Sequence, residues 1–130
     1  MLLYQPSAGS VVRCNFEGYK VPEITKSRPV LIIHKHKTNP KLVTVVPLSK
    51  TAPEKEEFYH LELDLLIEKT VKPYLSLCKR WFKCDLVYVV SIERMDRLHH
   101  AETKERYVPC VSSKTLKAVK EMVRLSNGLY

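Results

Sequence analysis

Two short aliphatic runs separated by a polar segment give the clearest pattern along the chain. The runs cover residues 30–33 and 42–46 and consist mostly of β-branched side chains, and residues 35–41 between them include Thr, Asn and Pro. Apolar runs of this length joined by turn-forming residues are typical of paired β-strands. The pattern therefore predicts an antiparallel hairpin.

The position of the loop sets the register of this hairpin. With the loop centred on residues 38–39, antiparallel pairing brings specific residues of the two strands face to face. The expected pairs are Ile33 with Thr44, Val30 with Pro47, and Arg28 with Ser49. A guanidinium group and a hydroxyl group then meet at the end of the hairpin that lies away from the loop.

Two prolines mark that same end of the hairpin. Pro29 holds Arg28 in an extended conformation, and Pro47 has no N–H group to donate to a sheet. We therefore expect both strands to fray beyond these prolines, so that the backbone there is free to bind a ligand.

Three further segments flank the hairpin. Residues 9–16 alternate loosely and predict a first strand, whereas residues 17–27 contain Gly and Pro and predict a loop. Residues 58–65 alternate leucines with polar side chains, which predicts a strand with one exposed face.

Residues 81–91 form the most strand-like segment, because they are rich in aromatic and β-branched side chains. A continuous strand here places alternate residues on opposite sides. One side carries Trp81, Lys83, Asp85 and Val87, and the other carries Phe82, Cys84 and Leu86.

The remaining segments are less regular until the C-terminus. Residues 66–80 contain a proline within a helix-compatible pattern and predict a loop with a short helical turn, and residues 92–107 predict an irregular excursion or a short strand and loop. Ser112 or Ser113 caps a final amphipathic helix that stops at Asn127-Gly128. The pattern predicts a β-rich α+β fold, a small β-barrel with one C-terminal helix, in a single domain spanning residues 1–130.

The charge of the chain is unevenly distributed. The formal net charge is +8, and residues 26–50 contain six basic residues and no acid. A concentrated basic face favours binding of a polyanion, with nucleic acid preferred over a membrane because no basic amphipathic helix of the membrane type is evident. The alternative is an ordinary solvated lysine surface. The candidate nucleic-acid-binding residues are Lys26, Lys35, Lys37, Lys41 and Lys50.

Neither the N-terminus nor the cysteines suggest export or a metal centre. The first residues, MLLYQPSAGS, have no basic flank and too short an apolar run for a signal peptide or membrane span, so we expect a cytoplasmic protein. The four cysteines lack a CxxC pair, which favours reduced thiols over disulfides or zinc. We expect no metal and no cofactor.

Four local motifs, in this order, resemble the MazF/PemK-type toxins of bacterial type II toxin–antitoxin systems. They are Gly9-Ser10-Val11-Val12, Glu23 followed by Arg28-Pro29-Val30-Leu31-Ile32-Ile33, Val45-Val46-Pro47-Leu48-Ser49, and Lys83-Cys84-Asp85. The resemblance implies an SH3-like barrel of the plasmid-toxin type, a homodimer, and a sequence-specific endoribonuclease of the mRNA interferase type. It also implies a bacterial or prophage origin and an acidic antitoxin protein as partner.

The same resemblance implies a catalytic set. Metal-independent RNA cleavage needs a base for the ribose hydroxyl proton, a cation for the charge on the phosphorane, and an acid for the leaving oxygen. By resemblance, Arg28 stabilises the phosphorane and can act as acid, while Glu23 or Asp85 is the base. Ser49 holds a phosphate oxygen, and Lys83, which stands where the family carries arginine, is a second cation. We favour Asp85 as base because a strand holds a side chain more firmly than a loop does.

Each of these residues also has a purely structural interpretation. Arg28 can pair with a surface acid, Lys83 and Asp85 can form an ion pair, and Ser49 can shape a turn. Two further pairs have both a functional and a structural interpretation. His34 and His36 can bind metal, act as acid and base, or be polar surface, and Trp81 and Tyr88 can stack on bases or lie in the core.

Two other functions remain open from the sequence. A gyrase-poison toxin of the CcdB type shares the barrel and needs no carboxylate beside Arg28, so Glu23 and Asp85 count against it. A non-catalytic nucleic-acid-binding module would use the same cationic face without cutting. Activity on bare RNA distinguishes these possibilities.

Overall fold

The computed structural model describes residues 1–20, 25–49, 60–62, 81–100 and 103–128. The strands and helices within these residues follow in chain order. They are β1 (Val11–Cys14), β2 (Arg28–Lys35), β3 (Leu42–Ser49), β4 (His60–Glu62), β5 (Trp81–Lys83), β6 (Tyr88–Ser91), a 3-10 helix (Ile92–Arg94), β7 (Met95–Asp96), β8 (Leu98–His99), β9 (Arg106–Tyr107) and α1 (Ser113–Ser126).

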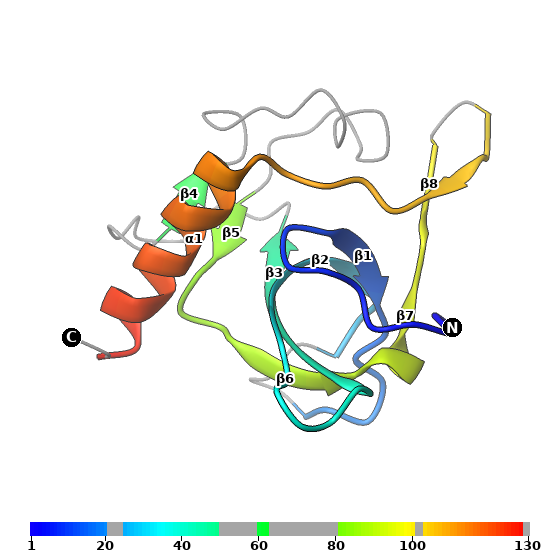
Figure 1. Cartoon of the computed structure of the whole chain (residues 1–130), viewed down its shortest axis with the longest axis horizontal. Helices are drawn as coiled ribbons and strands as arrows, with labels where there is room; N and C mark the ends of the chain where they lie inside the picture. Colours follow the sequence, from blue (N-terminus) through cyan, green and yellow to red (C-terminus); the bar gives the residue numbers. More distant parts are fainter. Residues whose placement is uncertain (21–24, 50–59, 63–80, 101–102, 129–130) are drawn as a thin grey trace.

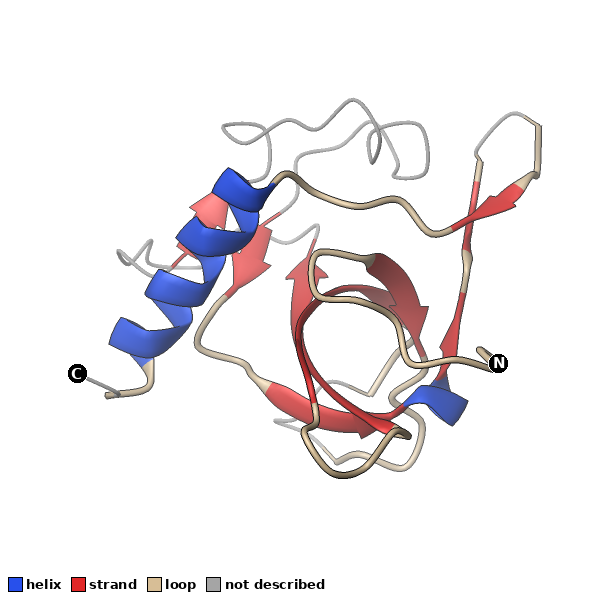
Figure 2. Cartoon of the chain, in the orientation of Figure 1, coloured by secondary structure: helices blue, strands red, loops and turns tan. Residues whose placement is uncertain are grey.

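Strands β1 to β7 form an antiparallel sheet with α1 beside it, and β8 and β9 form a separate two-stranded sheet. The order in the larger sheet is β4-β5-β3-β2-β1-β7, and β6 pairs with the first half of β3. Figure 2 shows the strands in red, with the long C-terminal helix in blue beside them. Strands β1, β2, β3, β6 and β7 curl around a common centre, while α1 lies outside the curl next to β4 and β5 (Figure 1). The predicted β-rich α+β fold is confirmed, but the described strands form a curved open sheet rather than a closed barrel because no ladder joins β7 to β4 or β6.

The sheet separates two apolar clusters. Val30 and Ile32 point into the curl, where they pack with residues of β1, β3 and β6, and Leu31 and Ile33 point towards α1. Because alternate residues of a strand face opposite sides, β2 has no solvent-facing side over this stretch. This double burial explains why residues 30–33 are continuously apolar.

The register of the central hairpin was predicted in part. Val30 pairs with Pro47 as expected, but a β-bulge between Ile32 and His34 places His34, rather than Ile33, opposite Thr44. A bulge adds one residue to one strand without a counterpart on the other, and the composition of the loop did not reveal it.

The predicted strand at residues 81–91 is wrong as a single element. It consists of β5 and β6, separated by a turn in which the Leu86 N–H donates to the Lys83 carbonyl at 2.9 Å. Val87 consequently packs on the helix-side cluster together with Phe82 and Cys84, not opposite to them. Because of this turn, the side chains of β6 do not continue the alternation between the two sides of the sheet that β5 begins.

Other elements predicted from periodicity are present in the structure. The first strand and the irregular excursion at residues 92–107 are confirmed, and β4 lies within the predicted strand 58–65, whose other residues, like residues 66–80, fall outside the described part. Ser112 caps α1 by accepting a hydrogen bond from the Thr115 N–H at 3.2 Å. No described helix has the length and apolar character needed to cross a membrane.

The described cysteines are free thiols, as predicted, and Cys78 lies outside the described residues. Cys14 and Cys84 are buried and Cys110 is exposed. Burial raises the pKa of the Cys14 thiol to about 12, with a smaller opposing effect of Arg94. Cys14 therefore acts as a small apolar core residue rather than as a nucleophile.

Candidate active site

The pairing between the two central strands ends at the predicted end of the hairpin. Val30–Pro47 is the last pair between β2 and β3; beyond it, Arg28 pairs with Cys14 of β1 and Ser49 pairs with Trp81 of β5. The expected separation of β2 from β3 beyond the two prolines is confirmed, whereas the expected pair of Arg28 with Ser49 is not formed. Both strands nevertheless stay in the sheet, because β1 pairs with β2 along residues 28–31 and β5 pairs with the end of β3.

Alternation places the candidate side chains on one face of the sheet. Arg28 alternates with Val30 and Ile32, which point into the curl. Lys83 lies between Phe82 and Cys84, which both point towards α1, so Lys83 points the other way. Ser49 is two residues beyond Pro47 on the strand and is buried.

Electrostatics link three of these residues. The pKa of the Lys83 ammonium group is lowered mainly by burial and also by the nearby Arg28 guanidinium, while the Asp85 carboxylate raises it. Effects of this kind require charges a few ångströms apart. The structure thus brings Arg28 near Lys83 and its neighbour Asp85, from which Arg28 is distant in the sequence.

The Arg28 guanidinium keeps an unused donor. The side chain is half-buried, and its Nε atom is buried without a hydrogen-bond partner among the described residues. A buried donor that stays unsatisfied is costly, and such atoms often serve a ligand. The Nε atom of Arg28 is therefore a candidate donor to an anionic ligand.

Asp85 lies in a turn rather than on a strand. The argument that a strand holds its side chain firmly is therefore wrong. Lys83 and Asp85 occupy the first and third positions of the turn that separates β5 from β6. Glu23, the other candidate base, lies outside the described residues, as does Lys50.

The described lysines of the basic segment are all exposed. Lys26 precedes β2, and Lys35, Lys37 and Lys41 lie around the loop between β2 and β3. Lys41 also lies 3.8 Å from the Glu93 carboxylate.

The two candidate histidines lie at the loop end of the hairpin, away from Arg28. His36 Nδ1 accepts a hydrogen bond from the Asn39 N–H at 2.9 Å and so shapes the loop, while His34 is exposed. Trp81 is buried, and Tyr88 stacks on Tyr19 with a ring separation of 5.6 Å. Among the described residues no three His, Cys, Asp or Glu side chains are arranged to hold a metal ion.

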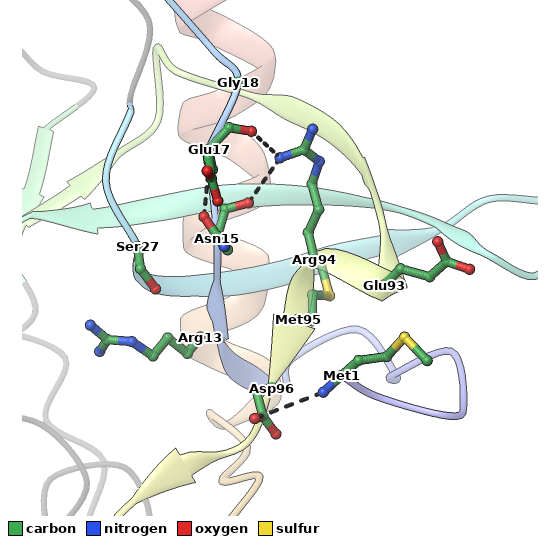
Figure 3. A pocket seen from close by; sticks show the side chains of 10 residues that line it. All are labelled: Met1, Arg13, Asn15, Glu17, Gly18, Ser27, Glu93, Arg94, Met95 and Asp96. Carbon is green, nitrogen blue, oxygen red and sulfur yellow. Dashed lines mark hydrogen bonds and ion pairs between the residues drawn. The ribbon is translucent and has the colours of Figure 1, made fainter.

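A cavity of about 520 Å³ lies beside β1 and β7 (Figure 3). Arg94 donates to the backbone carbonyls of Asn15 and Glu17 at 3.1 and 2.8 Å, which ties down the start of the loop leading to Arg28. The lining of the cavity contains Arg13, Arg94 and three acidic residues, and it contains none of the predicted catalytic residues. The lining residues are far apart in the sequence, so no local motif indicated this cavity.

A family model described as "PemK-like, MazF-like toxin of type II toxin-antitoxin system" matches residues 7–126. The chain belongs to this toxin family. The match covers nearly the whole chain and includes every predicted catalytic residue, so the resemblance carried by the four motifs is confirmed.

Curated relatives of this toxin are uncharacterized. It is 29% identical to the YifN protein of Escherichia coli strain K12 over 112 residues, covering 72% of this chain and 74% of the relative. It is 26% identical to an uncharacterized protein of Haemophilus influenzae, covering 97% and 95%.

Solved structures of the family share the fold of this toxin. MazF (Form-I) from Deinococcus radiodurans has a TM-score of 0.63 at 16% identity, with 96% of this chain and 98% of that chain covered. An endoribonuclease from Mycobacterial species in complex with its cognate antitoxin has a TM-score of 0.61 at 16% identity, covering 96% and 97%. At this identity, the likeness shows the fold alone.

Proposed function

We propose that this toxin is a sequence-specific, metal-independent endoribonuclease acting on single-stranded RNA, including mRNA. The observation that carries the proposal is the convergence of Arg28, Lys83 and Asp85 at the point where β2 and β3 separate. Two cations and a carboxylate within electrostatic reach supply the groups that phosphoryl transfer needs without a metal. Family membership and the endoribonuclease among the similar structures point to the same chemistry.

The reaction proceeds by internal attack. The carboxylate of Asp85 takes the proton of the ribose 2′-hydroxyl, whose oxygen forms a bond to the adjacent phosphorus. The Arg28 guanidinium and the Lys83 ammonium stabilise the added negative charge on the phosphorane. The bond from phosphorus to the 5′-oxygen then breaks, and that oxygen takes a proton from Arg28 or water. The products are a 2′,3′-cyclic phosphate and a 5′-hydroxyl.

Ser49 and the candidate bases have separate parts in this proposal. The Ser49 hydroxyl binds a phosphate oxygen and so orients the scissile group. Asp85 is preferred as base over Glu23 because Lys83 is in electrostatic contact with it. The carboxylate of Asp85 thereby stays close to the Lys83 ammonium group.

The surface charge supports RNA and an acidic protein as binding partners in the bacterial cytoplasm. Lys26, Lys35 and Lys37 are exposed cations of a segment without acids, and such segments bind phosphates in a salt-dependent manner. An antitoxin with an acidic segment would cover the same surface. We also propose a homodimer, as the family resemblance implies.

Incubation of the purified protein with a long RNA in EDTA, followed by mapping of the new ends, tests this function. We expect cuts at a short recurring sequence, each leaving a cyclic phosphate and a 5′-hydroxyl. Cutting that stops with EDTA and returns with magnesium or zinc would refute the metal-independent mechanism. RNA binding without cutting would support a non-catalytic module instead.

A further inference from the structure

The end of helix α1 binds one carbonyl group of the proposed active site. The Cys84 carbonyl oxygen accepts hydrogen bonds from the Ser126 hydroxyl at 3.0 Å and from the Asn127 side-chain amide at 3.1 Å. Cys84 lies between Lys83 and Asp85 in the sequence. The end of the helix is therefore hydrogen-bonded to the peptide group between Cys84 and Asp85. We call Ser126 and Asn127 the helix-end clamp.

The clamped carbonyl belongs to the central peptide of a β-turn. The Leu86 N–H donates to the Lys83 carbonyl at 2.9 Å, which puts Cys84 and Asp85 at the two middle positions. The main turn types differ by a flip of this central peptide, and the flipped type II form needs a positive φ at the second middle residue. Asp85 has no positive φ. Holding the Cys84 carbonyl therefore fixes the direction in which the Asp85 side chain leaves the turn.

We propose that Ser126 and Asn127 are positioning residues, which keep Asp85 and Lys83 in the arrangement that RNA cleavage requires by holding the Cys84 carbonyl. The inference rests on the proposed endoribonuclease function, because it assigns these residues to that reaction. Neither side chain contacts the substrate in this account; both act through the Cys84 peptide. Catalysis is sensitive to displacements of about 1 Å in a positioned group, which can cost about a hundredfold in rate.

Simple capping of the helix is the competing explanation. Ser126 and Asn127 also lie within hydrogen-bond distance of the Val123 carbonyl, at 3.3 and 2.8 Å, which satisfies a carbonyl at the helix end. Ser126→Ala keeps a good helix former, and Asn127→Gly keeps a residue that helix ends tolerate. This pair of changes removes both donors to Cys84 with little effect on the helix itself.

The kinetic test compares the full-length double variant Ser126→Ala/Asn127→Gly with two controls. Ser126→Thr in the otherwise unchanged protein retains the hydroxyl group, and Arg124→Ala removes the ion pair with Glu121 in the same helical turn. We expect kcat to fall at least about tenfold in the double variant, with KM within about twofold of the wild type and both controls close to wild type.

A folded double variant with the kcat of Arg124→Ala would overturn the proposal. If the double variant does not fold, the two single changes, each of which leaves one hydrogen bond to Cys84, provide the same comparison. Each single variant should then have a kcat below that of Arg124→Ala at unchanged KM, and the absence of any reduction would equally overturn the proposal.

An NMR titration of the Lys83 side chain gives a second readout that does not require cleavage. Asp85 raises the pKa of Lys83, so an Asp85 that is no longer held close should leave this pKa lower still. We expect the lower Lys83 pKa in the double variant and not in Arg124→Ala. An unchanged Lys83 pKa without the clamp would overturn the proposal. If the wild type itself does not cut RNA, the proposed function fails, and this titration still decides the clamp.

Discussion

Val30 and Pro47 form the last residue pair between β2 and β3; beyond this pair β2 stays paired with β1, and β3 pairs with β5. Pro47 has no N–H group, so the ladder loses little by ending there. Arg28 and Ser49, the next residues on that face, are held by β1 and β5 respectively. Arg28 thereby lies within electrostatic reach of Lys83, and Ser49 lies opposite Trp81 on the strand that leads to Lys83.

The lowered pKa of Lys83 predicts the alkaline pH dependence of cleavage. Burial, helped by the positive charge of Arg28, makes this ammonium group lose its proton at a lower pH than an ordinary lysine. If Lys83 must be charged, kcat falls as the pH rises through that lowered pKa. Lys83→Arg should shift or abolish this alkaline decrease, because a guanidinium stays charged. Identical alkaline limbs in the two pH–rate profiles would argue against a catalytic cation at this position.

The loop lysines should affect binding rather than chemistry. Lys37 is exposed, so we expect Lys37→Ala to weaken RNA binding equally for all sequences and to reduce the salt dependence by about one unit of slope. Lys41→Ala should have a smaller effect, since Glu93 already neutralises part of its charge. Filter binding at several salt concentrations measures both slopes. A strong loss of kcat with unchanged affinity for either variant would contradict this assignment.

The cap of α1 should contribute measurably to stability. Ser112 accepts a hydrogen bond from the Thr115 N–H at the start of the helix, and loss of such a cap typically costs about 1 kcal/mol. We expect Ser112→Ala to lower the free energy of unfolding by about that amount, whereas Ser112→Asp should largely preserve it. Urea denaturation followed by circular dichroism checks both values, and a Ser112→Ala protein as stable as the wild type would show that this cap is dispensable.

Local patterns in the sequence predicted most of the fold. The first strand, the hairpin and the capped C-terminal helix follow from periodicities and capping residues that reflect burial directly. The pairing of Val30 with Pro47 followed from the loop position alone. These features depend on interactions between residues close in sequence or on one apolar face.

Features that depend on the geometry of the curved sheet could not be predicted in this way. The bulge at Ile33 and the turn at Cys84–Asp85 interrupt runs whose composition is fully compatible with continuous strands. The family resemblance named Arg28, Ser49, Lys83 and Asp85, whereas the position of Arg28 near Lys83 depends on where the β2–β3 ladder ends and on the pairing of β5 with β3. Contacts between the helix end and Cys84 join positions more than forty residues apart, so no local signal reveals them.

The rate of cleavage and the affinity for RNA of Arg28→Ala, measured together, test the central claim most directly. If Arg28 carries transition-state charge, the single-turnover rate should fall about a hundredfold or more, while the dissociation constant for RNA changes much less. An RNA with deoxyribose solely at the cleavage position serves as the control, because it lacks the attacking hydroxyl and should bind without being cut. Equal losses of rate and affinity in Arg28→Ala, or cutting of the deoxy substrate, would contradict the proposed mechanism.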